Sequence, residues 1–249
     1  MSVPSSRSSG QSTPSRRDDF TVTHWTQVVL AANQDGSAQA RQALEALCVR
    51  YWPAIYSFLR GKNYGPDDAA DLTQGFFSHL LEENAIVRAD RSKGRFRNFL
   101  LGALQRFLVD DQRRNSAQKR GRGRVGLALD FPAMEECYLE EADPGLTPDQ
   151  LYDRRWAATV LETAFAELQA EFREADQSLR FDYLQRFLSE EASDGDYAAG
   201  AAQLGITAKA VSSAVSRLRE RYRELVRRTV LATVSGPEEI DPEFRELFR

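Results

Sequence analysis

Hydrophobic residues recur along this chain with the spacing of α-helices. The clearest run spans residues 96–108, where apolar side chains occupy one helical stripe: Phe96, Phe99, Leu100, Ala103, Leu104, Phe107 and Leu108. Such spacing places all of these side chains on the same side of a helix, facing a core. The alternation of apolar and polar residues that marks a strand is absent. The sequence therefore predicts an all-α fold.

The same criterion predicts helices before and after this run. One follows Ser37, with Pro53 expected to kink or break it. The next begins at Pro66, and its expected buried stripe is Leu72, Phe76, Phe77 and Leu80. Helical spacing resumes at Pro148, with one stripe of Trp156, Val160, Leu161, Phe165 and Leu168 and another of Phe181, Leu184, Phe187 and Leu188. Most of the chain is thus expected to be helical.

Segments without this periodicity divide the chain. Residues 1–18 are rich in Ser, Arg and Pro and predict a disordered arm. Residues 116–147 combine Gly, Pro and charged residues and predict a linker. We therefore expect two helical domains joined by a linker, the C-terminal one containing a helix-turn-helix. The first domain would span residues 19–115, the second residues 148–231, and an acidic tail residues 232–249.

The charge distribution adds two candidate binding surfaces. The chain of 249 residues has a net charge of −4, but its charges are segregated. Residues 88–124 hold twelve Lys or Arg against three Asp, and residues 196–228 hold seven against three acidic residues. Residues 125–195 hold seventeen acidic residues and only five Arg. Two basic segments that coincide with helical patterns predict contact with phosphates.

The second basic segment carries the most informative motif, YAAGAAQLGITAKAVSSAVSRLR, at residues 197–219. Ala201 and Ala202 are small enough to let two helices cross closely. Gly205 suits a left-handed helix end, and Thr207 suits the cap of the next helix. Polar and basic side chains are left outward or on the flanks of that helix: Lys209, Ser212, Ser213, Ser216, Arg217 and Arg219. Together with Thr207, these residues predict a helix-turn-helix that reads the major groove and holds phosphates.

The N-terminal half resembles a known family. Residues 43–82 are similar to the second conserved region of extracytoplasmic-function sigma factors, in which a D-A-x-D-L-x-Q-E-x-F element follows an aromatic-rich helix. Asp68-Ala69-Ala70-Asp71-Leu72-Thr73-Gln74 fits this element, Gly75 replaces the usual Glu, and Phe76 follows. The resemblance implies that this helix binds the clamp helices of the largest polymerase subunit. The implied contacts are Asp68, Asp71, Gln74 and Ser78.

Residues 94–114 resemble the helix with which this family melts the promoter and reads its minus-ten element. The preceding loop captures a flipped base in such proteins and corresponds to residues 88–95 here. The resemblance implies DNA contacts by Arg91, Lys93, Arg95, Arg97, Asn98 and Arg106. Residues 150–230 would then form the fourth region, which reads the minus-thirty-five element as duplex DNA. The resemblance covers roughly residues 40–115 and 150–230, about two thirds of the chain.

We therefore expect a cytoplasmic sigma factor that binds core RNA polymerase and promoter DNA and needs no metal or cofactor. An anti-sigma factor is the common regulatory partner in this family. Two alternatives stay open: a conventional helix-turn-helix regulator that binds DNA without polymerase, and a protein that sequesters polymerase without directing initiation. No Ser/His/Asp, Cys/His or phosphate-cradling constellation is found, which predicts a non-enzyme. Cys48 and Cys137 form neither a zinc cluster nor a disulfide framework, and no segment predicts a membrane span.

Overall fold

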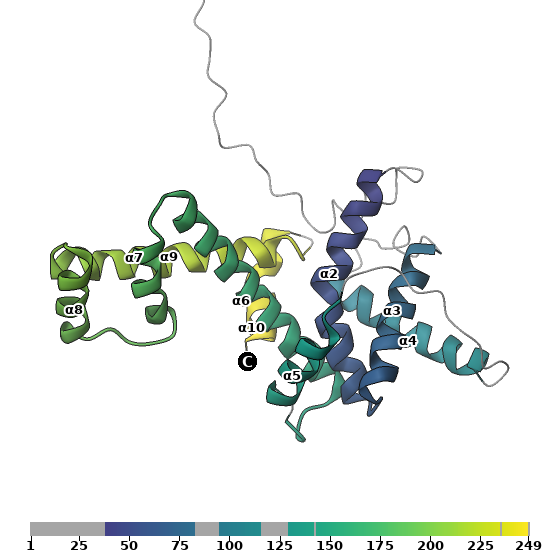
Figure 1. Cartoon of the computed structure of the whole chain (residues 1–249). Helices are drawn as coiled ribbons and strands as arrows, with labels where there is room; N and C mark the ends of the chain where they lie inside the picture. Colours follow the sequence, from purple (N-terminus) through teal and green to yellow (C-terminus); the bar gives the residue numbers. More distant parts are fainter. Residues whose placement is uncertain (1–37, 83–94, 116–128, 142, 235, 249) are drawn as a thin grey trace, which may run out of the picture.

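A computed structural model describes residues 38–82, 95–115, 129–141, 143–234 and 236–248, and each regular element in these residues is a helix (Figure 1). The predicted all-α fold is confirmed. The helices are α2 (Ala38–Gly61), α3 (Pro66–Glu82), α4 (Phe96–Asn115), α5 (Phe131–Glu141), α6 (Pro148–Glu174), α7 (Ser178–Leu184), η3 (Gln185–Leu188), α8 (Asp194–Leu204), α9 (Ala208–Leu231), η4 (Pro237–Glu239) and α10 (Ile240–Leu247). Within these described residues, no helix has the length and apolarity that a bilayer crossing requires.

The N-terminal core forms where α2, α3 and α4 bury their apolar stripes. The predicted stripe of α3 is buried throughout, and Phe76 contacts Phe107 of α4 with ring centroids 5.7 Å apart. On α4, Phe96, Leu100 and Leu104 are buried, whereas Phe99 and Ala103 are partly buried at its edge. Both stripes are therefore confirmed by their burial.

Pro53 was expected to kink or break helix α2, but the helix continues for eight residues beyond it. Proline has no N–H to donate to the carbonyl of residue 49, and the loss of this hydrogen bond weakens the helix locally. Dense packing around this point compensates for that loss, because Tyr51, Ile55 and Phe58 are all completely buried. Tertiary contacts thus override the local propensity of proline.

Helix α6 contacts two groups of helices, the N-terminal group of α2, α3 and α4 and the C-terminal group of α7, α8 and α9. Near its start, Trp156 stacks on Tyr51 of α2 with centroids 4.2 Å apart and planes within 8°. Nearer its end, Glu171 pairs with Arg221 of α9 at 2.6 Å, and Leu168 is fully buried. Thr147 caps this helix in a capping box with Gln150. The division into two domains stays a prediction, because this one helix supplies core residues to both groups.

Helix α5 lies inside the segment that was expected to be a linker. Its Phe131 ring contacts Trp52 of α2 at 5.1 Å, and its Met134 is buried. Its Glu135 carboxylate accepts hydrogen bonds from Arg60 at 2.7 and 2.8 Å and from Tyr56 at 2.6 Å. The helix is only 11 residues long and four glutamates interrupt its apolar residues, so its signal in the sequence is weak. Docking on α2 rather than amphipathic periodicity stabilises it.

The expected acidic tail also contains a helix, α10, which contacts α6 and α9 (Figure 1). Its Ile240, Glu243 and Leu247 are buried at a helical spacing of i, i+3 and i+7. Arg227 of α9 pairs with Asp241 at 3.0 Å, and its guanidinium lies over the Phe244 ring. Residues 237–247 are therefore part of the folded structure.

Candidate nucleic-acid interface

Helices α8 and α9 meet at a short turn whose conformation follows from its residues. Ser193 begins α8 with a capping box: its hydroxyl accepts a hydrogen bond from the Asp196 N–H, and the Asp196 carboxylate accepts one from the Ser193 N–H at 2.9 Å. Gly205 ends α8 in the left-handed region, with φ of 64°. The Thr207 hydroxyl accepts a hydrogen bond from the Ala210 N–H at 3.2 Å and caps α9. The predicted helix end and cap are both confirmed.

The close approach behind α8 occurs at Gly200, not at the alanines that follow it. Gly200 is buried, whereas Ala201 is partly buried and Ala202 is exposed. A Cβ atom added at Gly200 would lie 2.6 Å from Cε1 of Tyr183, which is closer than real Cβ contacts come. The Tyr183 hydroxyl also donates a hydrogen bond to the Asp196 carbonyl at 2.6 Å. The glycine therefore lets the tyrosine ring hold α8 against α7.

The two sides of α9 differ sharply in character near its start. Val211, Ala214, Val215 and Leu218 are buried against the rest of the protein. Four predicted DNA-binding residues are exposed and form what we call the outward face: Lys209, Ser213, Ser216 and Arg217. Ser212 is partly buried beside this face, and Thr207 is exposed at its start. The first turns of α9 thus present short polar groups and two cations to solvent.

Arg219 was expected to contact DNA, but its guanidinium is engaged within the protein. It donates hydrogen bonds to the carbonyl of Phe187 and to that of Glu190, both at 2.7 Å. Its side chain therefore ties α9 to the end of η3. In this conformation Arg219 positions the outward face rather than forming part of it.

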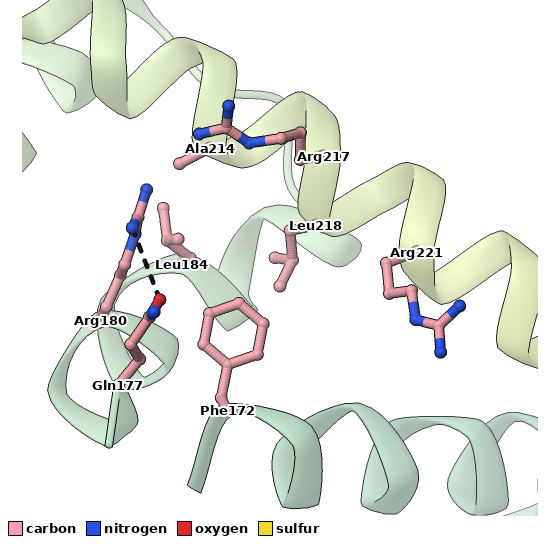
Figure 2. Close-up of a pocket in the computed structure, with 8 residues that line it drawn as sticks. All are labelled: Phe172, Gln177, Arg180, Leu184, Ala214, Arg217, Leu218 and Arg221. Carbon is pink, nitrogen blue, oxygen red and sulfur yellow. Dashed lines mark hydrogen bonds between the residues drawn. The ribbon is translucent and has the colours of Figure 1, made fainter. Parts of the chain in front are cut away.

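A hollow of about 220 Å³ lies on the other flank of α9, which we call the arginine hollow (Figure 2). It is lined by Phe172, Gln177, Arg180, Leu184, Ala214, Arg217, Leu218 and Arg221. Arg217 and Arg219 are two residues apart and so point about 200° apart around the helix. The outward face therefore lies between the hollow on one side and the Arg219 contacts on the other.

The three arginines of the hollow differ in their partners. Arg221 donates to Glu171 at 2.6 and 2.9 Å and to Glu224 at 2.8 Å, and these hydrogen bonds raise its pKa above the ordinary value. Arg180 and Arg217 form no ion pair with any residue that the structure describes. Figure 2 shows these two guanidiniums above the apolar floor, with Arg221 bent towards α6. Two cations in the hollow are thus without a compensating carboxylate among the described residues.

The first turn of α4 is arranged differently from the sequence prediction. Arg97 was expected to contact DNA, yet its side chain is only 2 % exposed. It pairs with Glu243 at 2.7 Å, with Glu246 at 2.8 Å and with Asp153. Burial alone would lower the pKa of Arg97, but the hydrogen bond and charge of Glu243 together with the neighbouring carboxylates raise it. Arg97 therefore holds α10 and α6 against α4.

Arg95 belongs to the same cluster of charges. It pairs with Glu243 at 2.7 Å and also with Glu246, so it too faces α10. Asn98 and Arg106 of α4 are exposed, as predicted for DNA-contacting residues. Arg91 and Lys93 lie outside the described residues. Of the predicted single-strand contacts, Asn98 and Arg106 are the ones that the described structure presents to solvent.

The predicted polymerase-binding residues lie along α3. Asp68 and Asp71 are exposed and Gln74 is partly buried. Ser78 is buried, contrary to the expectation that it faces outward, and its hydroxyl donates to the Gln74 carbonyl at 2.9 Å. It is buried because α3 is covered by α2 and by Phe107 of α4, so its packed sector is wider than its apolar stripe. Gly75, which stands where the resembled family has Glu, is also buried.

Two features of these surfaces were not predicted from the sequence: the position of Arg180 and the ion pairs of Glu243 and Glu246. Arg180 adjoins a predicted apolar stripe that was assigned only to the core, and nothing local shows that α7 brings it beside Arg217. Glu243 and Glu246 lie one helical turn apart, but their partners are almost 150 residues away. Long-range ion pairs leave no periodic signal, so only the fold could show them.

The chain matches no protein-family model, no curated protein and no solved structure. Its function is therefore inferred from the surfaces described above.

Proposed function

We propose that this protein is an RNA polymerase sigma factor of the extracytoplasmic-function kind, a dissociable subunit that directs transcription to particular promoters. The observation that carries this proposal is the pair α8–α9. Its first helix ends at Gly205, its second is capped by Thr207, and the outward face of α9 is polar and basic. A major groove admits an α-helix, whose side chains near the N-terminus then reach base edges. This pair would act as the helix-turn-helix that reads the upstream promoter element.

The exposed face of α3 supports the polymerase part of the proposal. Asp68 and Asp71 project into solvent from a helix whose opposite side is packed, and Gln74 lies beside them. These three residues belong to the motif that resembles the polymerase-binding element of the family. Their carboxylates suit a basic partner surface, such as the clamp helices. Ser78 is left out of this contact, because it is buried.

For the downstream element, we propose that α4 supplies Asn98 and Arg106, which are exposed on its solvent side. An amide can hydrogen-bond base edges, and an arginine can hold phosphates or stack on bases. We assign Arg97 a structural role instead, since it is buried among carboxylates. The contribution of residues 88–94 stays a prediction.

The test is run-off transcription with purified core RNA polymerase on genomic DNA fragments. Wild-type protein should give discrete new transcripts that core polymerase alone does not produce. The double substitution Asp68→Asn and Asp71→Asn should abolish them, because it removes the two exposed carboxylates of the motif that resembles the polymerase-binding element. The matched control is Asp149→Asn with Asp182→Asn, which removes two exposed carboxylates elsewhere and should leave the transcripts intact.

Binding of the same wild-type protein to core polymerase and to the same DNA fragments, measured beside the transcripts, separates the alternatives. Polymerase binding without transcripts would favour a protein that sequesters polymerase. Sequence-specific DNA binding without polymerase binding would favour a conventional regulator. Either result would contradict the sigma-factor proposal.

A further inference from the structure

The arginine hollow lies beside the outward face of α9, where DNA phosphates would pass if the proposed function holds. A helix lying in a major groove has the phosphates of both strands along its flanks. One flank of α9 carries the contacts of Arg219 with η3. The other flank opens into the hollow, between α9 and the end of α6 with α7 (Figure 2). A DNA strand on that flank would pass over the hollow.

We propose that the arginine hollow is a phosphate-binding site that holds a backbone phosphodiester of duplex DNA between Arg180 of α7 and Arg217 of α9. Arg180 is the new element of this assignment, because it lies outside the helix-turn-helix and outside every predicted DNA contact. It would add a phosphate clamp from a neighbouring helix. Such a contact fixes the register of α9 on the duplex without reading sequence itself.

The state of the two guanidiniums supports this assignment. Arg217 is exposed and has no hydrogen bond or ion pair with the residues that the structure describes. Arg180 makes one long contact of 3.5 Å with the Gln177 side chain, and its buried Nε has no hydrogen-bond partner there. Most of their donors are thus unused by the protein. Paired donors of this kind match the oxygens of a phosphate.

The lining of the hollow explains why these donors stay available. Phe172, Leu184 and Leu218 form its floor and offer no acceptor to either guanidinium. Arg221, the third cation, is already held by Glu171 and Glu224 and serves as a wall. Guanidinium is weakly hydrated and tolerates an apolar surface, where its attraction for an anion is screened less than in open water. The hollow is therefore suited to an anion that arrives from outside.

Continuity with the outward face favours DNA over an acidic peptide as the source of that anion. Arg217 belongs both to the hollow and to the outward face, next to Ser213 and Ser216 on the same turns of α9. A ligand that covers the outward face in the groove orientation would bring its own phosphates to Arg217 and on to Arg180. An isolated peptide in the hollow would need no such continuity.

The test is equilibrium binding of the full chain to a mixed-sequence DNA duplex. Binding is measured by fluorescence anisotropy at a series of salt concentrations. Arg180→Gln should weaken binding severalfold at fixed salt. It should also flatten the dependence of log affinity on log salt by about 0.9, the value for one lost phosphate contact. Arg180→Lys keeps the charge and should restore most of the slope. The control Arg154→Gln removes an exposed cation from the first half of α6 and should match the wild type.

The outcomes separate this inference from the proposed function. Wild-type binding with an unchanged slope in Arg180→Gln would overturn the phosphate site and leave the proposed function standing. Failure of the wild type to bind any duplex would overturn the phosphate site, whereas the proposed function is overturned separately, by the absence of new transcripts in the run-off experiment with core polymerase. Two further probes are inorganic phosphate and poly-glutamate, each at constant ionic strength. Tight binding of either one that is lost in Arg180→Gln, with an unchanged DNA slope, would assign the hollow to a free anion or an acidic peptide and overturn the DNA assignment.

Discussion

Gly200 and Gly205 position α8 for different physical reasons. Gly205 adopts φ of 64°, and nothing lies within 4 Å of an added Cβ. Its substitution by Ala should therefore cost only the backbone strain, about 1 kcal/mol. Gly200 has an ordinary helical backbone but no room, because Tyr183 lies against it. One glycine is needed for its dihedral angle and the other for its size.

We predict that Gly200→Ala destabilises the protein by about 2 kcal/mol, since the Tyr183 ring must move and overpacking typically costs that much. In a Tyr183→Leu background the same substitution should cost much less. The measurement is the free energy of unfolding from urea titrations of all four combinations. An equal cost in both backgrounds would show that the ring is not the cause.

These residues also show which roles of single residues can be predicted from the sequence. Gly205 and Thr207 were predicted because helix ends and caps depend on a few adjacent residues. The roles of Gly200, Arg97 and Arg219 could not be predicted, because their partners come from other helices. The prediction that an arginine contacts DNA rests on its charge. Whether that charge is available depends on carboxylates and carbonyls far away in the chain.

At the scale of helices, the long amphipathic segments were predicted well. The stripes on α3 and α4 and the start of α6 at Pro148 follow from periodicity and capping. Helices α5 and α10 were missed, because they are short and acidic residues interrupt their apolar ones. Short helices are marginal by themselves and form through tertiary contacts. Their sequences therefore resemble a linker and a tail.

The docking of α5 on α2 should depend on pH through Glu135. Burial alone would raise the pKa of this carboxyl, but hydrogen bonds from Arg60 and Tyr56 outweigh it and hold the pKa below its ordinary value. A lowered carboxyl pKa stabilises the folded state at neutral pH, and this contribution is lost as the pH falls through the lowered value. Asp153 acts in the opposite sense, because burial raises its pKa.

We predict that Glu135→Gln lowers the free energy of unfolding by about 1 kcal/mol near neutral pH, where a charge-assisted hydrogen bond is lost. The variant should also lose less stability than the wild type when the pH is lowered to about 3. Urea titrations at both pH values measure the two differences. The control is Glu136→Gln, an exposed neighbour that should leave stability near neutral pH unchanged. An equal acid loss in wild type and Glu135→Gln would contradict the role of this carboxylate.

For the molecule as a whole, α6 and α10 join the two groups of helices. In helix α6, Trp156 stacks on Tyr51 of α2, and Glu171 pairs with Arg221 of α9. Helix α10 contacts α9 and places Glu243 on Arg97 of α4. The Tyr152 hydroxyl of α6 donates to the Arg97 carbonyl at 3.0 Å, which adds a further link. The first turn of α4 is thus where three distant parts of the chain meet.

We predict that Glu243→Ala destabilises the protein by about 3 kcal/mol, since it leaves the buried Arg97 without its fully buried partner. Glu246→Ala should cost less than about 1 kcal/mol, because that carboxylate is 46 % exposed. Urea unfolding of both variants provides the comparison. If the two substitutions were equally costly, the burial of Glu243 would not explain the stability of this junction.

Under the proposed function, the outward face of α9 selects promoters for a bound polymerase. The most direct measurement maps transcript start sites made by core polymerase with the wild-type chain and with a Lys209→Gln, Ser213→Ala variant. We expect the wild type to give a defined set of start sites, and the variant to bind polymerase equally well while losing or changing that set. Start sites that are the same with the variant, or that appear without the protein, would contradict the claim.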